Sequence, residues 1–131
     1  MLRIIGMEEN ETGGRRAFAR ELEQRTLRFA VMVIRLSGRL PNSPEGRVVR
    51  NQLARSGTSP GANYREANRS RSKADFKSKI RICESELSET LYWLELIGES
   101  GWLTEAHLKS VNDECGELLA LFSSIARSCK L

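Results

Sequence analysis

The chain has 131 residues, of which 40% are apolar and 29% are charged, and its formal net charge at pH 7 is +4. This length predicts one domain with a single hydrophobic core, and the composition is that of a globular protein rather than a disordered one. No apolar run approaches the roughly 20 residues needed to cross a bilayer, and the opening MLRIIG is too short for a signal peptide. We therefore expect a cytoplasmic protein with no membrane partner.

The first part of the chain predicts a flexible arm followed by a helix. Residues 1–14 are polar and end in a glycine pair, so little there offsets the entropy lost on ordering. A helix is expected at about residues 15–37, where apolar residues recur at helical spacing. Its expected buried face consists of Phe18, Leu22, Phe29, Val33 and Leu36, widened by Ala30 and Ile34.

A second helix is expected at about residues 45–69, with Ser43 as its N-cap and Pro44 at its first position. Its middle is unusually rich in small residues, which let another backbone approach closely. We expect a second helix, or a second subunit, to pack against this stretch. The small residues are Ala54, Ser56, Gly57, Thr58, Ser59, Gly61 and Ala62.

The last two helices are expected at about residues 73–100 and 105–129. Ser72 with Asp75 forms a capping pattern before the third helix, Gly101 ends it, and Thr104 caps the fourth. Each helix carries a continuous apolar stripe with spacings of three and four. The predicted fold is all-α: residues 15–131 form an antiparallel up-down-up-down four-helix bundle.

Some apolar residues fall outside these stripes. A bundle with apolar residues left over usually covers them at a subunit interface, so we expect a homo-oligomer. The residues concerned are Tyr92, Trp93, Leu96, Leu119 and Leu121.

The sequence contains no recognisable catalytic or metal-binding constellation. Cys83, Cys115 and Cys129 form no CxxC pair and fall on helical core spacing, which predicts free, buried thiols. His107 has no Cys or Asp at ligand spacing and is expected at the surface near a helix start. We expect a protein that is not an enzyme, with no catalytic residues, no metal and no cofactor.

Charge is distributed unevenly along the chain. Residues 47–81 hold ten Lys or Arg against two acidic residues, whereas residues 84–117 hold nine acidic residues against Lys109. Such polarity predicts either complementary contact between subunits or a basic surface for an anionic partner. The candidate nucleic-acid-binding residues are Arg55, Arg65, Arg69, Arg71, Lys73, Lys77, Lys79 and Arg81.

A group of residues in the middle of the chain forms a pattern: Ser56, Ser59-Pro60, Asn63, Glu66, Arg69, Ser72, Phe76, Glu86, Glu89 and Tyr92-Trp93-Leu94. This pattern resembles the four-helix bundle family named for the protein encoded in the intervening sequence of 23S ribosomal RNA. The resemblance implies an up-down bundle that assembles into a ring, commonly a homopentamer. Some relatives are accessory proteins of diversity-generating retroelements, which contact a reverse transcriptase and RNA through a basic surface. The family usually has glycine where this chain has Ala67, so a continuous helix is expected there.

Two functions remain open from the sequence. The first is a non-enzymatic oligomeric scaffold that binds nucleic acid, with RNA preferred over DNA as the ligand. The family resemblance implies that such a scaffold would serve as an accessory to a reverse transcriptase. Contacts would be made to the phosphate backbone rather than to bases, because few aromatic residues lie near the basic ones. The alternative is a purely structural or protein-docking homo-oligomer, in which the basic residues meet acidic helices of a neighbouring subunit.

Overall fold

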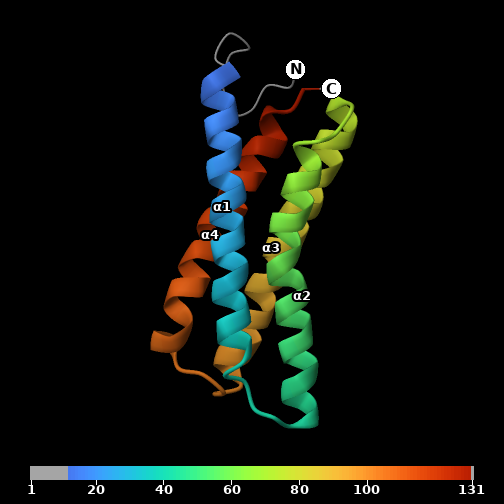
Figure 1. Cartoon of the computed structure of the whole chain (residues 1–131). Coiled ribbons are helices and arrows are strands. Elements are labelled where there is room, and N and C mark those ends of the chain that lie inside the picture. The colour runs from blue at the N-terminus through green and yellow to red at the C-terminus, as the bar shows by residue number, and fades with distance from the viewer. Residues whose placement is uncertain (1–11, 131) are drawn as a thin grey trace.

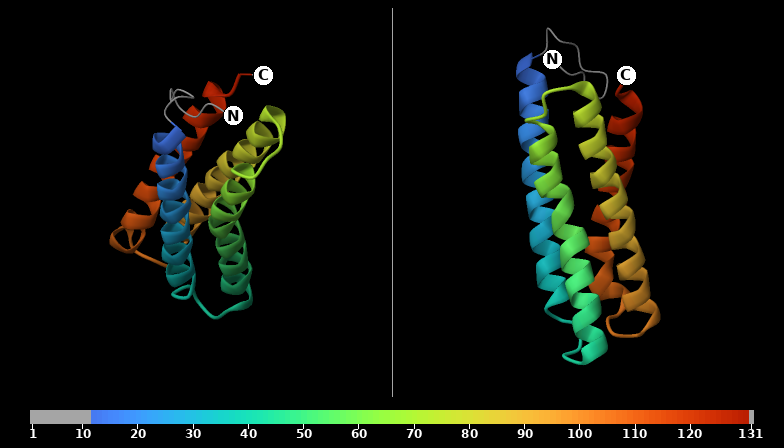
Figure 2. Two further views of the ribbon diagram at one scale, coloured as in Figure 1. Left: turned by 45° about the horizontal axis from the view of Figure 1, so that its top comes forward. Right: turned by 90° about the vertical axis from the view of Figure 1, so that its right-hand side faces the viewer.

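The computed structural model describes residues 12–130, which form four helices and no strand. The helices are α1 (Thr12–Ser37), α2 (Pro44–Ala67), α3 (Lys73–Glu99) and α4 (Glu105–Ser128). Figures 1 and 2 show long helices side by side, with the start of α1 and the end of α4 at the same end as the α2–α3 turn. The all-helical class and the number of helices are confirmed for the described part of the chain.

The helix ends fall close to the expected positions, with one difference at the N-terminus. Residues 12–14, expected in a flexible arm, belong to the first turn of α1, and the rest of that arm lies outside the described residues. The glycine pair raises the cost of this turn, by about 1 kcal/mol for each glycine relative to alanine, but does not prevent it. At the end of α2 the helix runs through Ala67 without a break before it, as expected from alanine at that position.

Local sequence signals explain where three of the helices begin. The Ser43 hydroxyl accepts a hydrogen bond from the Gly46 amide, and the Ser72 hydroxyl accepts one from the Asp75 amide, each at 3.0 Å. Thr104 caps α4 together with His107, whose ring nitrogen accepts a bond from the Thr104 amide. These bonds pair amide donors that a helix start leaves without partners.

Polar contacts between the helices set their relative directions. Between α2 and α3, the Cys83 thiol donates to the Pro60 carbonyl, and the hydroxyls of Ser56 and Thr90 lie 2.9 Å apart. Residue numbers rise on one helix as they fall on the other, so the two helices run antiparallel.

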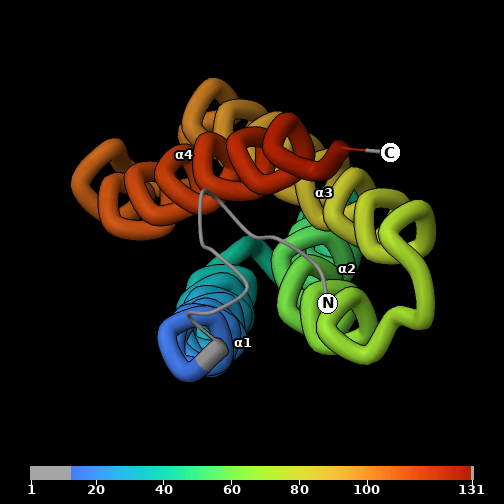
Figure 3. The backbone as a smooth tube through the Cα atoms, turned by 90° about the horizontal axis from the view of Figure 1, so that it is seen from above, coloured from blue at the N-terminus to red at the C-terminus, as the bar shows by residue number. Residues whose placement is uncertain are grey.

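The other neighbouring helices are also joined by polar contacts. The side-chain amide of Asn68, the C-cap of α2, donates to Glu23 of α1 at 2.9 Å, and the Ser123 hydroxyl of α4 donates to Glu84 of α3. Contact between α1 and α4 is much sparser than between consecutive helices. Figure 3 shows α1 beside α2 and farther from α4.

The small residues of α2 bring it close to α1 of the same chain. A Cβ on Gly57 would lie 2.5 Å from Val33 Cγ1, and a Cβ on Gly61 would lie 3.4 Å from the Thr26 hydroxyl. Of the two partners left open from the sequence, the packed neighbour is therefore a helix of the same subunit. Ala62, expected in the same contact, is exposed, because it is one residue on from Gly61 and about 100° around the helix.

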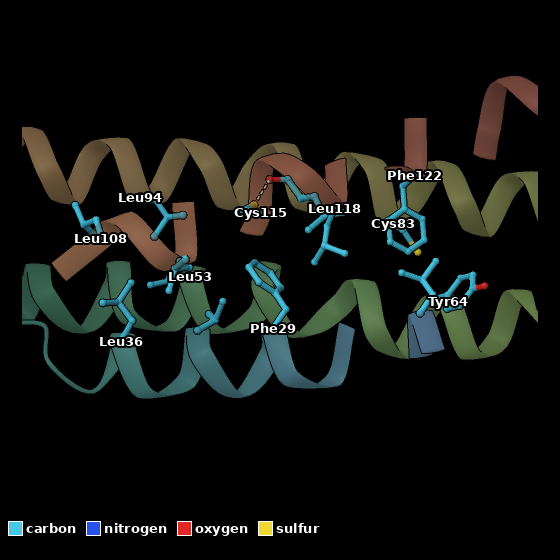
Figure 4. Packing of buried hydrophobic residues seen from close by; sticks show 14 of the residues in the cluster. Phe29, Leu36, Leu53, Tyr64, Cys83, Leu94, Leu108, Cys115, Leu118 and Phe122 are labelled. Atoms are coloured by element: carbon cyan, nitrogen blue, oxygen red, sulfur yellow. Dashed lines mark hydrogen bonds between the residues drawn. The ribbon is translucent and has the colours of Figure 1, made fainter. Parts of the chain in front are cut away.

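Large side chains from all four helices fill the core, as Figure 4 shows. Tyr64 packs edge-on against Phe122, with ring centroids 5.4 Å apart, and both side chains are fully buried. Cys83 and Cys115 are buried free thiols, and Cys129 is half-buried and free. Burial raises the pKa of Cys83 and of Cys115 to about 12, which leaves both thiols neutral.

Most of the apolar side chains expected at a subunit interface are partly buried within their own chain. Trp93, Leu96, Leu119 and Leu121 pack partly against the core of the same chain, whereas Tyr92 is 57% exposed. A different set is exposed on α1, including Ile34, which was expected to widen the buried face. Its members are Leu27, Val31 and Ile34, spaced by four and three.

Candidate nucleic-acid interface

The topology brings basic side chains from several helices to one end of the bundle. The end of α2, the α2–α3 turn, the start of α3 and the end of α4 all lie there (Figure 1). Lys and Arg residues in all these segments therefore form a common basic surface, which we call the basic end. It consists of Arg65, Arg69, Arg71, Lys73, Lys77, Arg81, Arg127 and Lys130.

Arg55, a predicted nucleic-acid contact, does not belong to the basic end. Its guanidinium binds two carboxylates of α3: it lies 3.1 Å from Glu86 and also contacts Glu89. The Trp93 indole N–H donates to Glu89 at 2.9 Å, and this bond together with Arg55 lowers the pKa of the Glu89 carboxyl. Arg55 therefore joins α2 to α3, because two acidic residues one helical turn apart face it.

Lys79 was also predicted to contact nucleic acid, and it faces α2 instead. Its ammonium lies 3.1 Å from the Glu66 carboxylate, which raises the pKa of Lys79. Lys77 is two residues earlier, so it points to nearly the opposite side of α3. The positive charge of Lys77 acts on the Cys129 thiol of α4, where it opposes the rise in pKa caused by burial.

More of the basic residues of α3 lie on its side toward α4 than on the side toward α2, where Lys79 lies. Arg81 bonds Glu84 at 2.8 Å, and Glu84 in turn accepts a hydrogen bond from Ser123 of α4. Those two bonds and the charge of Arg127 lower the pKa of Glu84, so the carboxylate stays ionised in the seam between the helices. We call the cations at the start of α3 and around the end of α4 the α3–α4 strip: Lys73, Lys77, Arg81, Arg127 and Lys130.

Five of the eight predicted residues carry charge that the described chain does not neutralise. Within residues 12–130, no ion pair involves Arg65, Arg69, Arg71, Lys73 or Lys77. Arg69, Arg71 and Lys73 are exposed, and Arg65 and Lys77 are half-buried. Their cationic groups are free to meet an anion.

Sequence reasoning missed Arg127 and Lys130, because they lie far from the basic segment in the chain. The register of antiparallel helices could have found them. Once α3 and α4 are joined by a short turn, the end of α4 must lie beside the start of α3.

The remaining residues behind the family resemblance have structural contacts. Ser56, Pro60 and Phe76 are buried, and Asn63 donates to the Ser59 hydroxyl at 2.9 Å. Their contacts lie within the bundle, as do the Glu66 ion pair and the Ser72 cap described above. These positions therefore shape the fold rather than a reactive centre.

No group of three His, Cys, Asp or Glu side chains among the described residues could hold a metal ion. His107 is exposed and serves in the Thr104 cap. In the part of the chain that the structure describes, no helix is long and apolar enough to cross a membrane.

These features define an all-helical protein of four helices with a basic surface at one end. Comparison with known proteins then places it: the chain belongs to the 23S rRNA-intervening sequence protein family, whose model matches residues 20–124. The resemblance found in the sequence is thus confirmed.

A solved structure supports the same family. It is a crystal structure of a protein with unknown function from the S23 ribosomal protein family of Bacteroides thetaiotaomicron. It is 39% identical, covers 81% of this chain and 98% of its own, and superimposes with a TM-score of 0.76. Neither the family description nor this structure names a catalytic activity. A comparison with curated proteins gave no match.

Proposed function

We propose that the protein is a non-enzymatic, oligomeric scaffold that binds nucleic acid through its basic end. RNA is the favoured ligand. The observation that carries this proposal is the set of cations at that end whose charge no described carboxylate neutralises. Lys and Arg that meet phosphates release condensed counterions, and this supplies most of the affinity of sequence-independent binding. The expected activity is therefore retention of RNA by its backbone.

Assembly belongs to the same proposal. A ring-shaped homo-oligomer, a pentamer by family resemblance, would repeat the basic end on every subunit. An RNA that reached several copies would bind more tightly than one subunit allows, with no new type of contact. Such a ring, working in the cytoplasm, would suit an accessory protein that presents RNA to a reverse transcriptase.

The test removes two of the unpaired cations and compares them with two charges elsewhere. Arg69→Ala with Lys73→Ala should weaken binding of labelled mixed RNA, measured by fluorescence anisotropy. It should also lower the slope of log affinity against log salt by about 2, near 1 for each lost phosphate contact. Arg47→Ala with Lys109→Ala removes the same charge from the opposite end, where Lys109 already pairs with Asp113, and should leave binding nearly unchanged.

The oligomer mass of each variant decides between this function and its rival. Native mass spectrometry should give the same mass for both double variants and the unaltered protein. If the Arg69 and Lys73 variant falls apart into monomers, these residues join subunits and the proposal fails. Equal RNA affinity for both double variants would also refute it.

A second candidate function is a structural or protein-docking homo-oligomer without nucleic acid. The exposed apolar face of α1, formed by Leu27, Val31 and Ile34, favours it, since contiguous apolar surface marks protein contacts. Leu27→Glu with Ile34→Glu should then lower the oligomer mass while the helical content is kept. This candidate prevails if that dissociation occurs and the unaltered protein binds no RNA at low salt.

A further inference from the structure

The aromatic side chains near the basic end are not placed to stack on bases. Tyr64, Phe76 and Phe122 are 0–1% exposed, and Phe18 packs partly against the core. Among the described residues, the one large exposed aromatic is Tyr92, in the second half of α3 and away from the basic end. Proteins that hold single strands without sequence preference combine a basic surface with aromatic stacking, so half of that arrangement is missing here.

The α3–α4 strip instead forms two rows of cations on antiparallel helices. Lys73, Lys77 and Arg81 follow one another at four-residue intervals, about 6 Å apart along α3. Arg127, in the last turn of α4, and Lys130, two residues beyond the end of that helix, form the second row. Packed helix axes lie about 8–10 Å apart, which sets the approximate separation of the rows. An RNA duplex likewise presents two phosphate backbones, one on each side of its wide and shallow minor groove.

The seam between the rows is not itself positive. Glu84 lies in it, bonded to Arg81 and Ser123, and its lowered pKa keeps it ionised. A single phosphate backbone lying along the seam would meet this carboxylate and be repelled. A duplex avoids the repulsion, because its two strands place phosphates over the two rows and its groove over the seam.

We infer that the α3–α4 strip recognises double-stranded segments of RNA, with one strand's phosphates on the α3 row and the other strand's on the α4 row. The inference rests on the proposed RNA binding and names the form of RNA that is bound. Recognition is by shape and backbone, as is usual for RNA duplexes, whose deep major groove is closed to side chains. Sequence preference is correspondingly weak.

The experiment compares two labelled probes on the full-length protein at one ionic strength. One is an RNA duplex of about 16 base pairs, a length that one duplex-binding module covers. The other is single-stranded oligo(U) with the same number of phosphates, so that total charge does not decide the result. The duplex should bind more tightly, with a steeper dependence of log affinity on log salt, because each phosphate contact contributes about 0.9 to the slope for a duplex and about 0.7 for a single strand.

Variants then test the two rows. Lys77→Ala with Arg127→Ala removes one cation from each row and should lower the duplex slope by about 2, while oligo(U) binding changes less. Arg47→Ala with Lys109→Ala is the matched control and should change neither probe. Circular dichroism and native mass show that each variant is folded and assembled.

The outcomes separate this inference from the proposed function. Oligo(U) binding as tightly as the duplex, or tighter, overturns the duplex assignment and leaves RNA binding standing. Duplex binding that is unaffected by the Lys77 and Arg127 variant overturns the assignment to this strip. If neither probe binds at low salt, the proposed function itself fails.

Discussion

Adding one methyl group to α2 tests how closely α1 and α2 are packed. The change is Gly57→Ala. Its Cβ would lie 2.5 Å from Val33 Cγ1, 2.7 Å from Cγ2 and 2.9 Å from Cβ. Carbon atoms in favourable contact are about 3.5–4.0 Å apart, so the helices must separate by roughly 1 Å. Rotating Val33 brings little relief, since valine keeps one rotamer in a helix and its Cβ is itself too close.

The expected cost follows from two opposing terms. Overpacking a filled site costs about 1–3 kcal/mol, while replacing glycine by alanine inside a helix returns about 1 kcal/mol. Gly116→Ala in α4 isolates the second term, because no atom lies within 4 Å of its added Cβ. The free energy of unfolding of Gly57→Ala should therefore be about 1–3 kcal/mol below that of Gly116→Ala.

Chemical denaturation at one protein concentration measures this difference, with oligomer mass checked for each variant. A third variant, Val33→Ala, makes room for the new methyl group. The double variant Gly57→Ala with Val33→Ala should lose less stability than the sum of the losses of the two single variants, by about 0.5–3 kcal/mol. The reasoning is refuted if Gly57→Ala and Gly116→Ala are equally stable, since α1 would then not be in contact with that face of α2.

Three further predictions concern buried polar groups. The Tyr64 hydroxyl is buried and has no hydrogen bond of good geometry, although the Asn68 side chain acts on it, so Tyr64→Phe should change the stability in thermal denaturation by less than about 1 kcal/mol. A larger loss would contradict this and show that the hydroxyl is hydrogen-bonded. Thr90→Val removes the hydroxyl 2.9 Å from Ser56 and should lower the free energy of unfolding by about 1–2 kcal/mol, whereas Thr90→Ser should cost less by keeping that bond. Burial raises the pKa of Cys83 and of Cys115 to about 12 from an ordinary 9.0, so their contribution to stability is complete below about pH 9 and is lost as the pH rises toward 12, where the unfolded thiols ionise first. Urea denaturation from about pH 8 to pH 10 should show this loss, and Cys83→Ala with Cys115→Ala should make it smaller; an unchanged pH dependence would contradict the assignment.

The fold was largely predictable because its signals are local. Ser43, Ser72 and Thr104 each mark a helix start through a bond to an amide three residues on, and the apolar stripes mark the buried faces. The sequence did not predict which of the small residues face α1. Gly61 and Ala62 are neighbours in sequence, and only the packed structure shows that the first is buried and the second exposed.

The candidate site was predictable as a region but not residue by residue. A count of charges cannot show that Arg55 is held by Glu86 and Glu89, because that pairing depends on the register between α2 and α3. The sequence did not assign Arg127 to the basic end, because more than forty residues separate it from Arg81. Long-range pairing of helices, which periodicity alone does not encode, decides both points.

The sparse contact between α1 and α4 has a consequence for how the molecule opens. Packing runs from each helix to the next along the chain, and Arg25 with Glu114 and Glu117 supplies the ion pairs recorded across the remaining side. A fold whose contacts are mostly sequential resembles a short linear array, and helices at the ends of such an array detach at lower free energy than those inside it. Hydrogen exchange should accordingly release the amides of α1 before those of α3, through a partly open state in which α2, α3 and α4 stay together.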